Sequence, residues 1–245
     1  MIVRPGRLLR RASVAVAGDP YYSSVSLLAV NNNGANGSTT FTDQSSVGHT
    51  ITAVGNAAWS TTRAPTGLTS SLAIDGVGDR LSVPDHTSLD LGSGDFTIEF
   101  TMWCNSVTGL ISPLGKRTSG SPERWAMFLI NDGDFTWRAA GLPLVSNWDI
   151  ANFAGIGTVT TNTWYHVALC RSGNTWTPYL SGVAGSGVVT SSKALSNDAV
   201  PLTIGGDGGG SGWDLNGNIG AVRITKGVAR YTANFTPPSL PYLSS

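Results

Sequence analysis

Few residues of the chain combine the type and the spacing that catalysis needs. His166 and Cys170 come nearest to a cysteine–histidine pair, because they lie on one face of the strand-like stretch NTWYHVALCRSGNTWTPYLSGV. Four residues along a strand separate two side chains by about 13 Å, which is far outside hydrogen-bond reach. His49 and His86 belong to no H-x-x-x-H or H-E-x-x-H pattern, and no G-x-S-x-G elbow occurs. The sequence therefore predicts that His166 packs or satisfies a backbone group.

The glycine-rich loop GGDGGGSGWDLNG (Gly205–Gly217) carries residue types that bind a ligand without reacting with it. Its carboxylate and amide oxygens suit polar ligands, and a tryptophan ring suits the apolar face of a sugar. The alternative is a plain hairpin loop whose tryptophan covers the edge of the fold. The candidate ligand-binding residues are Asp207, Trp213, Asp214, Asn216 and Trp148, and the candidate metal ligands among them are Asp207 and Asp214.

The surrounding elements read as β-strands. Phe96–Cys104 alternates over nine residues, so Phe96 and every second residue after it should face a core, with the threonines and Glu99 on the other face. Trp164–Arg171 and Thr175–Leu180 flank a Ser-Gly-Asn turn and predict a hairpin, in which Pro178 marks an edge or a bulge. The remaining predicted strands are Ser26–Val30, Thr50–Val54, Ser71–Ile74, Leu81–Val83, Leu110–Gly115, Trp125–Ile130, Phe135–Ala139, Leu202–Gly205 and Asn218–Thr225.

Composition favours a single all-β domain. Only 12% of the 245 residues are charged, 31 are glycine, and turn-forming clusters such as NNNGANGS separate the strands. The apolar runs are too short for a membrane span, and the broken apolar run near the N-terminus does not make a signal peptide. Cys104 and Cys170 lie within strand-like patterns, which favours buried free thiols.

A basic arm precedes the predicted body. We divide the chain into an arm at 1–20 and a β-sandwich at 21–245. Without the arm's four arginines, the chain has 11 basic and 15 acidic residues, so the arm should dock electrostatically on another protein. Nucleic acid is the less favoured partner, because the body has no basic stripe. The arm arginines are Arg4, Arg7, Arg10 and Arg11.

Several blocks of the sequence resemble the concanavalin A-like lectin/glucanase superfamily, in particular laminin-G-like domains of bacteriophage tail and other virion proteins. The resemblance covers about residues 24–240 and is carried by D-G-x-G-D at Asp75–Asp79, W-Y-H-V-A at Trp164–Ala168 and V-R-I-T-x-G-V-A-R-Y at Val222–Tyr231. It implies a jelly-roll sandwich of two antiparallel sheets, with the first and last strands close together.

The resemblance also bears on metal and catalysis. Relatives often bind Ca²⁺ through acids at one rim, but Asn31-Asn32-Asn33 and Gly220-Ala221 stand where phage relatives carry acids. Calcium needs six to eight oxygen ligands, so the Ca²⁺ site is weakened and we expect no cofactor. Glucanase members use an E-x-D-x-E arrangement, whereas Glu99 and Glu123 are the only glutamates here.

The resemblance and the arm lead to one functional expectation. The chain should be a non-enzymatic bacteriophage virion structural protein at the particle surface, anchored to other virion proteins by its arm. Its lectin-like body should decorate the particle or adhere to host glycans, and a homo-oligomer is expected. The alternative is a free secreted carbohydrate-binding module, and a glycoside hydrolase is the least expected function.

Overall fold

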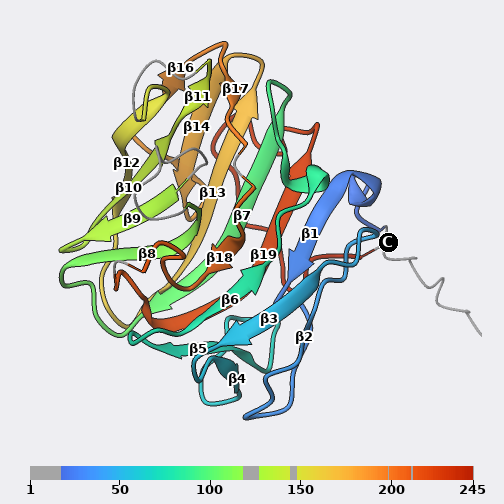
Figure 1. The fold of residues 1–245 in the computed structure, drawn as a ribbon, viewed down its shortest axis with the longest axis vertical. Helices are drawn as coiled ribbons and strands as arrows, with labels where there is room; N and C mark the ends of the chain where they lie inside the picture. The colour runs from blue at the N-terminus through green and yellow to red at the C-terminus, as the bar shows by residue number, and fades with distance from the viewer. Residues whose placement is uncertain (1–17, 118–126, 144–147, 198, 211, 245) are drawn as a thin grey trace, which may run out of the picture.

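The computed structural model describes residues 18–117, 127–143, 148–197, 199–210 and 212–244, which form two antiparallel sheets packed face to face (Figure 1). The all-β sandwich expected from the sequence is confirmed. The four arm arginines lie outside the described residues. Within the described part of the chain, no helix is long and apolar enough to cross a membrane.

One sheet has nine strands in the order β15-β14-β13-β7-β19-β5-β4, with β1 beside β19 and β16 beside β14. The pairing of β1 with β19 places the first and last strands together, as the family resemblance implies. The strands of this nine-stranded sheet are β1 (Val25–Ala29), β4 (Ala58–Ser60), β5 (Ser71–Asp75), β7 (Phe96–Cys104), β13 (Trp164–Ser172), β14 (Thr175–Leu180), β15 (Val183–Ala184), β16 (Val189–Thr190) and β19 (Asn216–Lys226).

The other sheet has eight strands in the order β12-β10-β9-β8-β18-β6-β3-β2. Its strands are β2 (Phe41–Thr42), β3 (Thr50–Val54), β6 (Arg80–Val83), β8 (Leu110–Lys116), β9 (Met127–Asn131), β10 (Asp134–Ala139), β12 (Ala151–Thr158) and β18 (Leu202–Ile204). A two-stranded sheet pairs β11 (Gly141–Leu142) with β17 (Ala194–Leu195), and two 3₁₀ turns are η1 (Tyr22–Ser24) and η2 (Thr87–Leu89).

Each of the twelve predicted strands overlaps an observed one, although the start of the predicted Trp125–Ile130 strand lies outside the described residues. The eight-residue β12 was not predicted. Two glycines weaken its strand pattern, and its register against β10 shifts twice. Phe153, within β12, has a positive φ of 52°, which cannot be recognised from the sequence pattern. Pro178 lies in β14, which is one strand in from the edge of its sheet, and the short outer strands β15 and β16 pair with residues on either side of Pro178 but not with Pro178 itself.

Both faces of β7 are buried, for different reasons. Phe96, Phe100 and their apolar neighbours at every second position pack between the sheets, as the alternation predicts. The opposite face carries Glu99, which is 0% exposed. Terminal segments of the chain cover this outer face, since Tyr231 and Asp19 contact its polar groups. The strand pattern alone cannot show such a covering.

Glu99 is the centre of a buried polar cluster. One carboxylate oxygen, Oε1, accepts a bond from Arg223 Nε at 2.8 Å, and Oε2 accepts one from the Tyr231 hydroxyl at 2.8 Å. His166 Nε2 lies 3.1 Å from Oε2. His166 packs edge-on against Phe235, with 5.6 Å between the ring centroids, as predicted, but its polar partner is a carboxylate on the neighbouring strand and not a backbone group. Asp19 extends the cluster through Arg223 Nη1, at 3.1 Å.

The two cysteines take no part in these hydrogen bonds, although Cys170 packs against Tyr231 beside the cluster. Cys104 and Cys170 are buried and free, which confirms the predicted thiols. Burial raises the pKa of both thiols to about 12, so both stay protonated at neutral pH.

The Glu99 cluster predicts acid-sensitive folding. Burial raises the pKa of Glu99, but the hydrogen bond with His166 and the charge of Arg223 outweigh burial and lower it to about 2, against 4.5 for a free glutamate. Between those values the unfolded chain binds more protons than the folded chain. The contribution of Glu99 to stability is therefore complete above about pH 4.5 and is lost as the pH falls towards 2.

Urea unfolding at several pH values tests this prediction. The free energy of unfolding should fall between pH 4.5 and 2, and Glu99→Gln should make that fall smaller. An identical acid dependence in the wild type and the variant would contradict the assignment.

Candidate functional site

The glycine-rich loop places Asp207 in an ion pair. Arg117 Nε lies 2.7 Å from Oδ1 of Asp207 and Arg117 Nη2 lies 3.0 Å from Oδ2, so the guanidinium binds both carboxylate oxygens. Asp207 is 2% exposed, and the guanidinium of Arg117 stacks 4.4 Å from the Trp213 ring centroid. Asp207 therefore organises the loop from inside and presents no free oxygen to a ligand.

The two candidate metal ligands do not fit a calcium site. The oxygens of Asp207 are held by Arg117, whose positive charge opposes a cation there. Asp214 Oδ2 accepts the Gly78 N–H at 2.8 Å, and its Oδ1 accepts the Asp207 N–H at 3.3 Å. Within the described ranges, no group of three or more His, Cys, Asp or Glu side chains could hold a metal ion. We derive no role for Ca²⁺.

Trp148 and Trp213 meet on the outer face of the eight-stranded sheet. Trp148 is 6% exposed, packs on Leu129, and has the guanidinium of Arg138 at 4.1 Å from its ring centroid. Trp213 is half-buried and packs in the same cluster. Trp148 therefore has no open ring face for a sugar, whereas Trp213 keeps part of its surface exposed.

Asn216 lies in a different site, at the ends of three strands of the nine-stranded sheet. It begins β19, pairs with Asp75 at the end of β5, and accepts a bond from the Asn105 amide, at 3.0 Å, just after β7. These side chains line a hollow of about 450 Å³. We call it the rim hollow and define it by Asn56, Arg63, Asp75, Asn105, Asn216 and Asn218.

Strand pairing forms the floor of the rim hollow and places two tryptophans beside it. Asn218 of β19 stands opposite Ala73 of β5 on one side and Trp103 of β7 on the other. Trp103 in turn stands opposite Trp164 of β13, so the four side chains share the outer face of the sheet. The half-buried rings of Trp103 and Trp164 lie 5.9 Å apart. Gly217 permits the close approach of β19 and β7, because a Cβ there would lie 2.0 Å from the Trp103 carbonyl oxygen.

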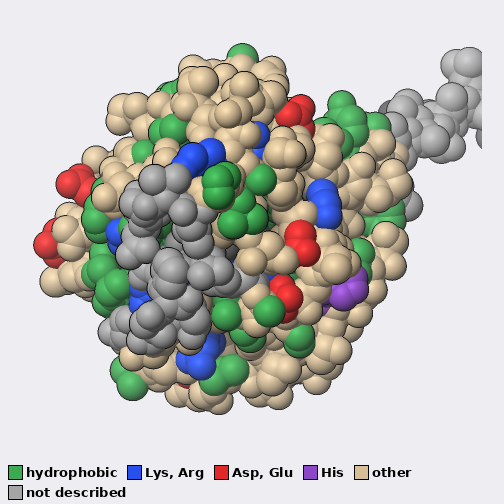
Figure 2. Space-filling view, turned by 45° about the horizontal axis from the view of Figure 1, so that its top comes forward, with side chains coloured by type: hydrophobic (Ala, Val, Ile, Leu, Met, Phe, Trp, Pro, Cys, Tyr) green, Lys and Arg blue, Asp and Glu red, His purple; other side chains and the backbone are tan. Residues whose placement is uncertain are grey.

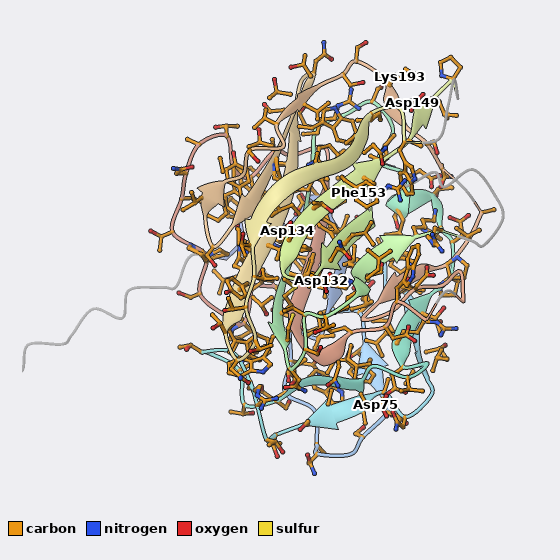
Figure 3. All side chains as sticks on the ribbon, turned by 90° about the vertical axis from the view of Figure 1, so that its left-hand side faces the viewer. Asp75, Asp132, Asp134, Asp149, Phe153 and Lys193 are labelled. Carbon is orange, nitrogen blue, oxygen red and sulfur yellow. The ribbon has the colours of Figure 1, made fainter. Side chains whose placement is uncertain are left out.

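The Asp75–Asp79 loop positions the acid of the rim hollow. The buried Asp79 carboxylate accepts backbone N–H groups of Asn56 at 2.7 Å and of Asp75 at 3.2 Å, and burial raises its pKa. The Asn56 amide and the Val77 N–H bond to the exposed Asp75 carboxylate and lower its pKa. Asp75 is therefore ionised at neutral pH and faces solvent at one end of the molecule (Figure 3).

A second hollow of about 540 Å³ adjoins the first. The two share Asp75 and Asn216, and the second also includes Val77, Trp213 and Asp214. The structure thus brings three of the predicted ligand residues (Trp213, Asp214 and Asn216) to one rim, and leaves Asp207 and Trp148 inside the fold.

Sequence reasoning missed most of the rim hollow. Asp75 was visible as the first residue of the D-G-x-G-D motif, and Asn105 follows the clearest predicted strand, yet neither was chosen as a site residue. Arg63 and Asn56 lie in turn-rich stretches that carry no motif. Only strand pairing shows that these residues meet.

Comparison with known proteins agrees with this architecture. A family model described as the concanavalin A-like lectin/glucanases superfamily matches residues 75–230, which is more than half of the chain. A search of curated protein sequences finds no match.

Three solved structures illustrate the similarity of fold. The binding domain of Paraclostridial Mosquitocidal Protein 1 aligns with a TM-score of 0.60 and 14% identity, over 84% of this chain and 49% of that chain. Domain 4 of AbnA, a GH43 extracellular arabinanase from Geobacillus stearothermophilus, in complex with arabinotriose, aligns with a TM-score of 0.57 and 14% identity. That alignment covers 84% of this chain and 94% of that chain. The Botulinum neurotoxin serotype D ligand binding domain in complex with N-acetylneuraminic acid aligns with a TM-score of 0.57 and 14% identity, over 85% of this chain and 49% of that chain. The chain thus spans about half the length of the two toxin domains.

Proposed function

The chain belongs to the concanavalin A-like lectin/glucanases superfamily, and from that premise we propose that it is a non-enzymatic carbohydrate-binding protein whose site is the rim hollow. The observation that carries the proposal is the set of amide, carboxylate and guanidinium groups that converge on a hollow of about 450 Å³ beside half-buried tryptophans. Concave sites with a few convergent polar groups are the usual form of small-ligand sites.

The polar groups of the hollow suit sugar hydroxyls, which both donate and accept hydrogen bonds. Asp75 accepts, Arg63 donates, and the amides of Asn105 and Asn216 do both. The Trp103 ring lies beside the hollow, stacked against the Arg63 guanidinium, and the Trp164 ring lies next to it. Two of the similar solved structures are complexes with arabinotriose and N-acetylneuraminic acid, which supports a ligand of this class on this fold.

The absence of enzymatic activity is part of the proposal. Glycoside hydrolysis needs two carboxyl groups that reach the substrate. Glu99 is fully buried and its oxygens already bind Arg223, Tyr231 and His166, so it cannot reach a glycosidic oxygen. Glu123 lies outside the described residues.

We further propose that the arm anchors this body in a bacteriophage particle, bound to other virion proteins in a homo-oligomeric arrangement. The support is the arginine-rich sequence of the arm together with the resemblance of three sequence motifs to those of virion proteins. The site of attachment is compatible with glycan binding at the rim. Asp19 contacts Arg223, and Asn216 in the rim hollow lies seven residues earlier on β19, a separation of about 20 Å along the strand.

Charge on the body does not favour a nucleic-acid partner over a protein partner. On the face shown in Figure 2, acidic and basic side chains are scattered singly among uncharged ones, without a basic stripe over the coloured surface.

Antibodies against the body should label purified particles regularly in electron micrographs. Bare particles would contradict the virion role and leave glycan binding untouched.

A glycan array probed with the full chain tests the carbohydrate proposal. We expect binding to a restricted set of glycans, with no release of reducing sugar after prolonged incubation with the bound glycans. Hydrolysis of a bound glycan would contradict the non-enzymatic role, and an empty array would contradict carbohydrate binding.

A further inference from the structure

Arg63 has no acidic partner, unlike three other arginines of the described residues. Arg117 pairs with Asp207 at 2.7 Å, Arg223 with Glu99 at 2.8 Å, and Arg230 with Asp19 at 2.7 Å. Among the residues that the structure describes, no carboxylate lies within 4.0 Å of the Arg63 guanidinium. A half-buried cation that has no direct ion-pair partner attracts an anionic ligand.

The guanidinium of Arg63 is held in one orientation. Its Nη1 donates to Asn105 Oδ1 at 2.9 Å and to Asn218 Oδ1 at 3.2 Å, and its plane lies 4.6 Å from the Trp103 ring centroid. Asn218 is itself fixed, because its amide donates to Ser71 Oγ at 3.0 Å. An arginine already ordered in the free protein loses little side-chain entropy when a ligand binds.

The unused donors of Arg63 match a carboxylate. Both bonds to asparagine leave from Nη1, so the fork of Nε and Nη2 has no partner in the described part of the chain. Two parallel N–H groups are the arrangement that binds both oxygens of a carboxylate. The rim hollow therefore has a free bidentate donor at one end.

The other end of the hollow is an acceptor. Asn216 pairs with Asp75, and Asn218, which binds Arg63, lies two residues further along the same strand face, about 6.6 Å away. The ionised Asp75 accepts hydroxyl donors and repels a second anion. The lining of the hollow thus contains both a cation, Arg63, and an anion, Asp75.

Building on the proposed function, we infer that the rim hollow selects acidic sugars. The sugar carboxylate pairs with Nε and Nη2 of Arg63, and ring hydroxyls donate to Asp75. The hydroxyls of a neutral sugar can accept single hydrogen bonds from Arg63, but they cannot form this charged bidentate pair.

Carboxyl methyl esters provide the matched probe, because they remove the charge of an acidic sugar and keep its shape. Oligogalacturonate, an oligoglucuronate and a sialylated oligosaccharide, each with its methyl ester, would be titrated into the full chain by calorimetry. We expect at least one acid to bind at least tenfold more tightly than its ester, and the difference to shrink as salt is added.

Two variants assign the preference to Arg63. In Arg63→Gln the acid and its ester should bind with equal affinity, because the charged fork that distinguishes them is gone. Arg63→Lys keeps the charge without the fork and should retain part of the preference. Unchanged melting temperatures would show that both variants fold.

The outcomes separate this inference from the proposed function. Equal binding of acids and esters by the wild type, or an acid preference that survives Arg63→Gln, overturns acidic-sugar selection and leaves carbohydrate binding standing. The absence of binding to any sugar, charged or neutral, overturns both.

Discussion

Replacing Glu99 with alanine is expected to lower the free energy of unfolding by about 3–5 kcal/mol, because it leaves buried partners without their counter-charge. Arg223 is 5% exposed and would keep only the Asp19 carboxylate. The Tyr231 hydroxyl and His166 Nε2 would lose the acceptor that they share. The terminal segments that Glu99 fastens to the sheet should therefore loosen first.

Urea or thermal unfolding measures this effect directly. Asp134→Ala is the matched control, since Asp134 is an exposed acid at the start of β10 (Figure 3), and surface substitutions usually change stability by less than about 0.5 kcal/mol. A Glu99→Ala effect as small as that of the control would show that the cluster does not stabilise the fold.

The double variant Asn105→Ala/Asn216→Ala should weaken glycan binding about tenfold to a hundredfold. The two amides bond to each other at 3.0 Å, and Asn105 also orients Arg63. Each hydrogen bond to a ligand contributes about 0.5–1.5 kcal/mol, and 1.4 kcal/mol corresponds to a factor of ten in affinity. Titration calorimetry with the best glycan from the array would measure the loss.

Asn152→Ala is the control for that variant. Asn152 is an exposed amide on β12, in the other sheet, next to Phe153, which Figure 3 places far from Asp75. The affinity of the Asn152→Ala variant for the glycan should match that of the wild type. An equal loss of glycan affinity in the double variant and in Asn152→Ala, or no loss in either, would show that the glycan does not bind in the rim hollow.

The core-forming strands could be predicted because their signal is local. In β7 the apolar residues at every second position face the opposite sheet, and the turn residues before β14 fix the hairpin with β13. β12 lacks such a signal, because its glycines and the positive φ of Phe153 depend on packing against the rest of the sheet.

The site could be predicted only in part, because its residues come from separate turns. Asn216 was found through the glycine-rich loop, but Asp207 was misjudged as a ligand residue because its partner Arg117 is 90 residues away. Arg63 and Asn218 are 155 residues apart and meet only through the pairing of β5 with β19. Long-range pairing of this kind leaves no local pattern in a single sequence.

One face of the nine-stranded sheet thus has two uses. Near Glu99 and Arg223 its polar residues are buried under the terminal segments and hold the fold together. Near Trp103 and Asn218 the same face is open and lined with groups that bind polar ligands. The boundary lies along β7, where Thr101 separates the buried cluster from the tryptophan pair.

The central claim is that sugars bind in the rim hollow, and side-chain amide NMR tests it most directly. In spectra of the ¹⁵N-labelled full chain, addition of the bound glycan should shift the amide signals of Asn56, Asn105, Asn216 and Asn218 and leave that of Asn152 in place. Shifts confined to other regions of the molecule would contradict the account.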